Sequence, residues 1–345
     1  MNRRTHLRTM AGLAFAALLG TTGKSFSKPT PTLANVPAGK VMTVTGAISP
    51  SDLGLTLPHE HVFSRFGKDA ARYPSYFEEN LMESVVPYLK KLKDLGVDTI
   101  VDATAAFFGR HPEFLNKISN ETGVQIITNT GYYGAAKGKY IPKHVDDETA
   151  EEIAKRWISE IRNGIDETGV YPGFIKTALE HKPMLDVDKK LIKAAALAHK
   201  ETGLVIQTHT GDNIYAANES INILTQNGVA AEAWIWVHAH NVTEPANLYP
   251  MAKMGSFISF DGLNEKNAEH ILNGLKQFKA EGLLHKALLS HDGNSFRSDG
   301  SRKDYHFLLT GFKPQFLAFG FTEDDFEQLT VKNPAAALTI KKRLT

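Results

Sequence analysis

One short junction recurs along this chain and constrains its fold more than any other feature. A helical stretch ends in glycine and is followed at once by a run of aliphatic or β-branched residues, at Gly96, Gly123, Gly169 and Gly203. Glycine is favoured just after a helix because it adopts the left-handed backbone without steric cost, and the residues that follow have strand propensity. The repeated junction therefore predicts successive helix and strand units, as in an α/β protein.

Short hydrophobic runs alternate with amphipathic stretches through the rest of the chain. We expect eight strands, the first ending at His61, and runs of such units with one hydrophobic strand each predict a parallel sheet. Eight units close naturally into a barrel. The expected strands are 53–61, 99–101, 124–128, 174–175, 204–208, 234–237, 256–260 and 287–290, and the expected helices are 77–95, 148–167, 186–201, 219–228 and 265–281.

An open, doubly wound sheet is the alternative for the same pattern. That fold should carry a glycine-rich phosphate loop after its first strand, whereas His59-Glu60-His61 stands there. We therefore favour the α/β class with a (β/α)8 TIM barrel. Residues 41–48 and 53–61 are expected to form an N-terminal β-hairpin around the turn-rich Ser49–Asp52.

The N-terminus has the layout of an export signal. Arg3, Arg4 and Arg8 precede a mostly small and apolar run over 9–23. This run is shorter than the ~20 residues needed to span a bilayer, which predicts no stable membrane anchor, although an amphipathic anchor is the alternative. The arginine pair resembles a twin-arginine signal. We expect residues 1–28 to be a signal peptide cleaved somewhere in 23–37, residues 38–345 to form a single barrel domain, and the protein to be periplasmic.

Composition narrows the chemistry. The chain has 345 residues and 0 Cys, which excludes disulfides, cysteine-bound zinc and a thiolate nucleophile. Basic and acidic residues nearly balance, 39 against 38, and no basic stripe appears beyond the N-terminus, so nucleic acid is disfavoured as a partner. The 14 histidines must carry most metal or acid–base chemistry, the expected partner is a small-molecule substrate, and a homodimer is left open.

Several predicted strands end in histidine. His59 and His61 are two residues apart on one strand, so both imidazoles share a face and can reach one cation, while Glu60 points the other way and is predicted to be structural. His209 and His238 each end a later strand. Because barrel enzymes place their sites at this end of the strands, we expect the four histidines to converge.

Asp292 and Lys176 are the candidate catalytic residues. Asp292 ends the last strand and could bind a metal through one oxygen and accept a proton through the other, or could merely cap a helix. Lys176 could bind an anionic substrate as an ammonium. It could instead lose its proton and add carbon dioxide, since burial and nearby cations lower a lysine pKa. The residue types alone leave both roles open.

Ordered motifs between Thr45 and Asp292 resemble the phosphotriesterase family of the amidohydrolase superfamily. The resemblance implies one divalent metal ion on His59, His61 and Asp292, a second on His209 and His238, and a bridging carbamate on Lys176. It also implies a bridging hydroxide whose proton Asp292 accepts. Zinc is expected first, with manganese, cobalt or iron as alternatives. The motifs are Leu57–Phe63, Gly96–Asp102, Gly109-Arg110, Thr130–Tyr133, Gly173–Lys176 and Thr208–Thr210.

Two segments depart from the family pattern. The sixth strand usually ends in Gly-His and an acidic residue, but here reads Val237-His238-Ala239-His240-Asn241. His238 is preferred over His240 because its seventeen-residue step to Gly255 fits the pattern better. The loop 293–314, with Arg297, Arg302, Lys303 and Asp304, matches no known specificity pattern.

These observations predict a periplasmic binuclear-metal hydrolase of lactones or carboxylic esters, with phosphotriester cleavage as a side activity. A phosphodiesterase or amidohydrolase using the same metals is the second hypothesis, which the basic loop would favour if the substrate is anionic. A non-catalytic periplasmic barrel that binds a metal or a ligand is the third.

Overall fold

Eight parallel strand positions form a closed barrel in the computed structural model, which describes residues 36–72, 78–180 and 183–345. β5 and β6 flank Thr128 and together fill one position, because β5 pairs with β4 and β6 pairs with β7. The predicted barrel is confirmed. Its strands are β3 (Thr56–Glu60), β4 (Thr99–Asp102), β5 (Gln125–Ile127), β6 (Asn129–Tyr133), β7 (Phe174–Ala178), β8 (Ile206–His209), β9 (Trp234–Val237), β10 (Phe257–Phe260) and β11 (Ala287–Leu289).

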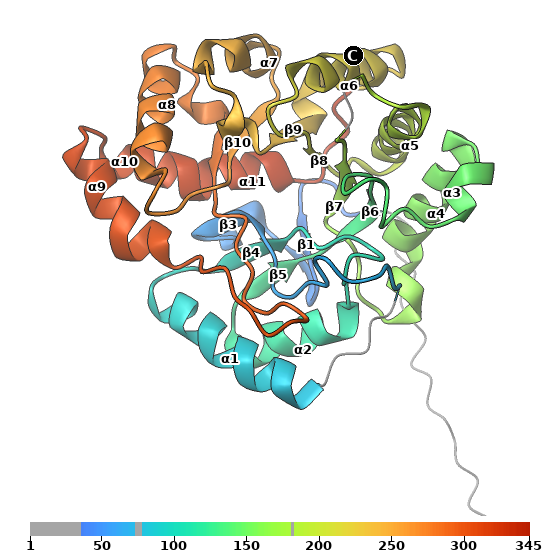
Figure 1. The fold of residues 1–345 in the computed structure, drawn as a ribbon, viewed down its shortest axis with the longest axis horizontal. Coiled ribbons are helices and arrows are strands. Elements are labelled where there is room, and N and C mark those ends of the chain that lie inside the picture. The colour runs from blue at the N-terminus through green and yellow to red at the C-terminus, as the bar shows by residue number, and fades with distance from the viewer. Residues whose placement is uncertain (1–35, 73–77, 181–182) are drawn as a thin grey trace, which may run out of the picture.

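Helices surround the strands on the outside (Figure 1). Gly123 and Gly203 cap α2 and α5 in the left-handed conformation, as the sequence predicts. The predicted helix 148–167 ends earlier, at Asn163, and α6 begins five residues before the predicted position. The helices are α1 (Glu78–Asp94), α2 (Pro112–Thr122), α3 (His144–Asp147), α4 (Ala150–Asn163), α5 (Asp186–Thr202), α6 (Ile214–Gln226), α7 (Tyr249–Lys253), α8 (Ala268–Ala280), α9 (Lys313–Ala318), α10 (Glu323–Glu327) and α11 (Asn333–Leu338).

The N-terminal hairpin exists, but the prediction of its turn was wrong. β1 (Val41–Thr43) pairs antiparallel with β2 (Gly46–Ile48), so the chain reverses within the first predicted strand. Gly46 permits this reversal because it adopts φ 131°, and the Thr43 hydroxyl donates to the Gly46 carbonyl at 2.8 Å. Ser49–Asp52 instead leads into a 3-10 turn, and β3 pairs with β4.

The hairpin closes the amino-terminal end of the barrel. Val41 belongs to the same buried cluster as Val101, Ile127 and Phe174, from three barrel strands. Gly173 makes this contact possible, since a Cβ there would lie 2.4 Å from the carbonyl oxygen of Met42. One end of the barrel is therefore filled, and the opposite rim remains for chemistry.

The predicted signal peptide, residues 1–28, lies outside the described residues. Within the described part of the chain, no helix combines the length and apolarity that crossing a bilayer requires.

Glu60 stabilises the seam, the contact between β3 and the segment after β11 where the barrel closes. Its fully buried carboxylate accepts hydrogen bonds from the Ser290 hydroxyl at 2.7 Å, from the amide and Nδ1 of His291 at 3.0 and 2.8 Å, and from the Gly293 amide at 2.5 Å. Backbone bonds complete the seam, from Asp292 to the His59 carbonyl and from His61 to the Gly293 carbonyl. The structural role predicted for Glu60 fits this geometry.

Replacing Glu60 with alanine should destabilise the protein strongly. The Glu60→Ala variant leaves several buried donors without an acceptor, each costing about 1–3 kcal/mol. We expect the free energy of unfolding to fall by roughly 3 kcal/mol or more, measured by urea titration. Glu121→Ala, at an exposed position of α2, is the matched control and should change it by less than about 0.5 kcal/mol. Equal effects in the two variants would contradict the role of Glu60.

Candidate metal centre

The six predicted ligands all lie at the carboxyl end of the barrel. His59 is in β3, Lys176 in β7 and His209 at the end of β8. His61 and His238 directly follow β3 and β9, and Asp292 lies three residues after the end of β11. Because the strands are parallel, their carboxyl ends meet at one rim. The structure therefore brings these side chains from five strand positions into one group.

His59, His61 and Asp292 form a compact set of donors. The Nε2 atoms of the two imidazoles lie 3.5 and 3.3 Å from Oδ1 of Asp292. Ligand atoms of the three residues lie within 4.8 Å of one another, as ligands of a single ion must. Bonds from the two imidazoles hold the pKa of Asp292 well below its ordinary value even though burial alone would raise it.

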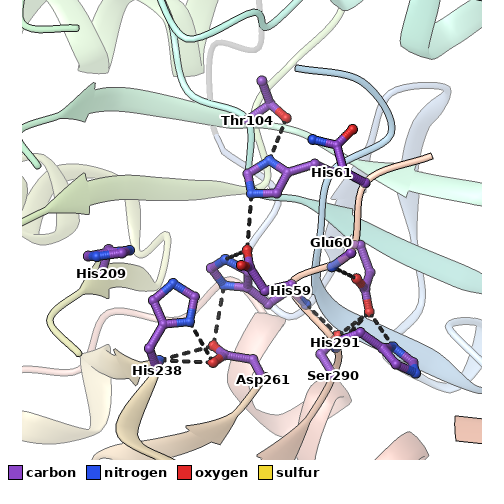
Figure 2. Close-up of polar contacts among 12 residues, drawn as sticks. His59, Glu60, His61, Thr104, His209, His238, Asp261, Ser290 and His291 are labelled. Carbon is purple, nitrogen blue, oxygen red and sulfur yellow. Dashed lines mark hydrogen bonds and ion pairs between the residues drawn. The ribbon is translucent and has the colours of Figure 1, made fainter. Parts of the chain in front are cut away.

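His209 and His238 lie beside this first set. Their ring centroids are 4.4 Å apart, and that of His238 is 5.1 Å from that of His59 (Figure 2). The Tyr133 hydroxyl is 3.4 Å from Nδ1 of His209, and Asp261 bonds Nδ1 of His238 at 2.8 Å. In both rings Nδ1 is engaged by a protein group, so Nε2 is the nitrogen that could bind a second metal ion.

Lys176 is buried among these groups. Its side chain is 1% exposed, and Nζ has no hydrogen-bond partner among the described residues. Burial lowers the pKa of Lys176 to about 8, although Asp261 and Asp292 act in the opposite direction. A buried ammonium without a partner is costly, and the lysine is more easily deprotonated than an exposed one. The residue therefore has the chemistry that a bridging metal ligand requires.

Asp261 is a member of the site that the sequence analysis missed. This buried carboxylate follows β10 and accepts bonds from the amide of His238 at 3.0 and 3.2 Å as well as from its ring. Nδ1 of His240 and Nδ1 of His59 are 3.3 and 3.6 Å away. Burial would raise the pKa of Asp261, but His238 holds it well below its ordinary value. An acid directly after the predicted strand 256–260 was the available signal.

The structure separates His238 from His240. The His238 ring faces His209 and His59, whereas the His240 ring covers Gly262, where a Cβ would lie 2.0 Å from Nε2 of His240. His240, His238 and Asp261 also form a set of potential ligand atoms, which would compete for His238. The contacts of His238 with the other predicted ligands favour it over His240 as a member of the main group.

Backbone strain and a polar relay orient these side chains. His238 and Asp292 adopt positive φ values of 63° and 52°, a conformation that costs free energy in non-glycine residues and is concentrated at functional sites. Nδ1 of His61 contacts the Thr104 hydroxyl at 2.8 Å, and Thr104 lies 3.0 Å from Asp102. Such partners of the second ring nitrogen fix the orientation of a ligating histidine.

Aromatic rings form one wall of the site. Phe108 lies edge-on to His61, with centroids 5.6 Å apart, and stacks on Tyr133 at 4.9 Å. Phe66 is 56% exposed and contacts Phe108 at the rim. The wall offers an apolar surface beside the predicted ligands.

Comparisons with known proteins agree with this geometry. The sequence profile of the phosphotriesterase family matches residues 39–338. The chain is 32% identical to an aryldialkylphosphatase of Saccharolobus solfataricus over 71% of this chain and 79% of that protein. It is 26% identical to an N-acetyltaurine hydrolase of Xenopus tropicalis over 88% and 99%.

A solved structure also resembles the chain closely. It comes from the engineering of organophosphate hydrolysis activity on a weak promiscuous lactonase template, and it aligns with a TM-score of 0.77 and 29% identity over 87% of this chain and 99% of that one. The match of the family profile over most of the chain, together with the barrel and the groups that could hold metal, establishes that this chain belongs to the phosphotriesterase family and is a hydrolase.

Proposed function

We propose that this protein is a binuclear-metal hydrolase of lactones or carboxylic esters, with phosphotriester cleavage as a side activity. The observation that carries the proposal is the convergence of His59, His61, Asp292, His209, His238 and Lys176 at one rim.

In this proposal, His59, His61 and Asp292 hold one ion, His209 and His238 hold the other, and Lys176 bridges them as a carbamate. The unpartnered Nζ of Lys176 fits that role, and the nitrogen and carboxylate donors suit zinc, with manganese, cobalt or iron as alternatives. When bound, a pair of divalent ions supplies hydroxide from water at neutral pH and polarises the substrate.

The chain's own residues would orient the substrate and handle the proton. Oδ1 of Asp292 faces His59 and His61, whereas Oδ2 faces Lys303. Oδ2 would therefore accept a proton when Lys303 does not pair with it. Phe108 and Tyr133 provide an apolar wall against which a hydrocarbon part of the substrate would pack. These contacts suit an uncharged ester bond with an aliphatic chain.

The comparisons support two bond types. The lactonase template among the solved structures supports a lactone, and the N-acetyltaurine hydrolase among the relatives supports an amide. Both bonds present a carbonyl that passes through an oxyanion, which the same metal centre stabilises. Amide hydrolysis is therefore the second candidate.

Metal analysis tests the centre. We expect the wild-type protein to hold about two divalent ions per chain by plasma emission spectroscopy. Asp292→Asn and Lys176→Ala should each lose metal and at least roughly 100-fold in kcat/KM, since ligand loss exceeds the 10–100-fold typical of outer-shell partners. Carbon-13 labelling with bicarbonate should give a carbamate resonance that Lys176→Ala lacks. Lys189→Ala, exposed on α5, is the control. Wild-type turnover and metal content in both site variants would refute the centre.

A substrate panel tests the reaction. We expect the metal-loaded protein to hydrolyse γ- and δ-lactones or aryl carboxylic esters with a kcat/KM at least about tenfold above that for acyl amides and phosphotriesters, measured by pH-indicator and chromogenic assays. Activity confined to amides would favour the second candidate, and a protein that retains two metals but hydrolyses no carbonyl substrate would contradict both.

We also propose that the protein is exported to the periplasm through the twin-arginine route. The support is the arrangement of Arg3, Arg4 and the following apolar run. The Arg3→Lys/Arg4→Lys double variant keeps the charge but should retain the protein in the cytoplasm, as measured by cell fractionation. N-terminal sequencing of the exported wild-type protein should place cleavage within 23–37. Equal periplasmic yields of the two proteins would contradict this route.

A further inference from the structure

Lys303 reaches the candidate metal centre from the loop after β11. Its Nζ lies 3.3 Å from Oδ2 of Asp292, and the two side chains are 39% and 31% exposed. Asp292 already faces two imidazoles through its other oxygen. Lys303 is therefore a solvent-accessible cation at the edge of a site that is itself built to hold cations.

Strand pairing fixes the position of Lys303. Its amide and carbonyl exchange hydrogen bonds with Asn294 at 2.8 and 2.7 Å, and Asn294 forms a parallel bridge with His61. The lysine backbone is thus registered against the rim of the barrel. This arrangement places the Lys303 side chain within reach of Asp292.

The two arginines of the loop contact neighbouring protein groups rather than a predicted metal ligand. Arg302 donates to the Ser295 carbonyl and to Ser84, and its guanidinium lies 4.5 Å from the ring centre of Tyr88. The Arg297 guanidinium lies over Phe66. Among Arg297, Arg302 and Lys303, it is Lys303 that contacts a predicted metal ligand.

A cavity of about 450 Å³ opens beside Lys303. Asp304 contributes to its wall, but its carboxylate already accepts a hydrogen bond from the Tyr88 hydroxyl at 2.9 Å and lies 3.0 Å from Nδ1 of His306. The cavity is lined by Leu263, Asn264, Glu265, Lys266, Lys303, Asp304 and Phe307. It therefore joins apolar surface to a cation at the edge of the centre. A larger cavity of about 580 Å³ lies elsewhere, along α4. None of the predicted ligands lines either cavity, but the smaller one is connected to Asp292 through Lys303.

We propose that Lys303 binds an anionic group of the substrate, of the carboxylate class, while the bond to be cleaved lies at the metal centre. This inference rests on the proposed function and specifies its substrate. A lysine beside metal ions raises the electrostatic energy of the free site, and an anion on the substrate removes that cost. A charge-assisted hydrogen bond also adds to the binding of the anion. The rest of the substrate chain occupies the adjoining cavity.

A matched ester pair tests the proposal with the metal-loaded protein. Mono-4-nitrophenyl glutarate and 4-nitrophenyl pentanoate have the same chain length and differ in a terminal carboxylate or methyl group. We expect the wild-type protein to prefer the glutarate ester in kcat/KM, and Lys303→Met to reduce this preference at least about tenfold, mainly through KM. Lys303→Arg should keep most of the preference. Lys189→Met, on α5, removes an exposed charge elsewhere and should keep it entirely.

Equilibrium binding separates the inference from the proposed function. Calorimetric titration with glutarate and with pentanoate measures the same preference without turnover, and metal analysis verifies each variant. A preference that Lys303→Met abolishes supports the inference even if neither ester is hydrolysed, in which case ester hydrolysis fails alone. Ester hydrolysis without a Lys303-dependent preference overturns the inference alone. A parallel loss on both esters also overturns it, because Lys303 would then only position Asp292.

Discussion

At the seam between β3 and β11, three consecutive residues point alternately to two sides of the strand. Glu60 binds the backbone and side chains of residues 290–293, while His59 and His61 face the rim and approach Asp292. The same short loop therefore supplies both the partners of Glu60 and the carboxylate of the candidate metal site. Barrel closure and the alignment of His59 and His61 with Asp292 therefore depend on the same strand register, and a shift of one residue would disrupt both.

The site also depends on the buried Asp261 carboxylate, which lies close to several histidines at once. Asp261 serves His238 through both backbone and ring and lies close to His59 and His240, so one carboxylate orients several imidazoles. Burial and the nearby Lys176 lower the pKa of His59 to about 3, which keeps this ring neutral and able to bind a metal. Nζ of Lys176 has no hydrogen-bond partner among the described residues, which is consistent with its expected role at a metal centre.

Sequence periodicity predicted the parts of the molecule that follow from regular structure. The junctions at Gly123 and Gly203 located the ends of α2 and α5, and the two-residue alternation put His59 and His61 on one face with Glu60 on the other. The hairpin turn depends on the positive φ of Gly46, which has no periodic signal. Asp261 directly follows a predicted strand, but only its contacts with His238 show that it belongs to the site. The contact between Lys303 and Asp292 depends on the pairing of Lys303 with Asn294 in the loop, and residue spacing in the sequence does not predict that pairing.

Strands position the candidate metal ligands, whereas loops supply the residues around them that would determine substrate specificity. The candidate metal ligands lie in strands or within three residues of a strand end, where strand pairing holds the backbone. Lys303 and the walls of its cavity come from the loops after β10 and β11, whose sequences can change without disturbing strand register. A family whose relatives are named for organophosphate and N-acetyltaurine hydrolysis can thus keep one centre while loop residues select the group attached to the cleaved bond. In this chain, the contact between Lys303 and Asp292 joins the loop after β11 to the candidate metal centre at the rim of the barrel.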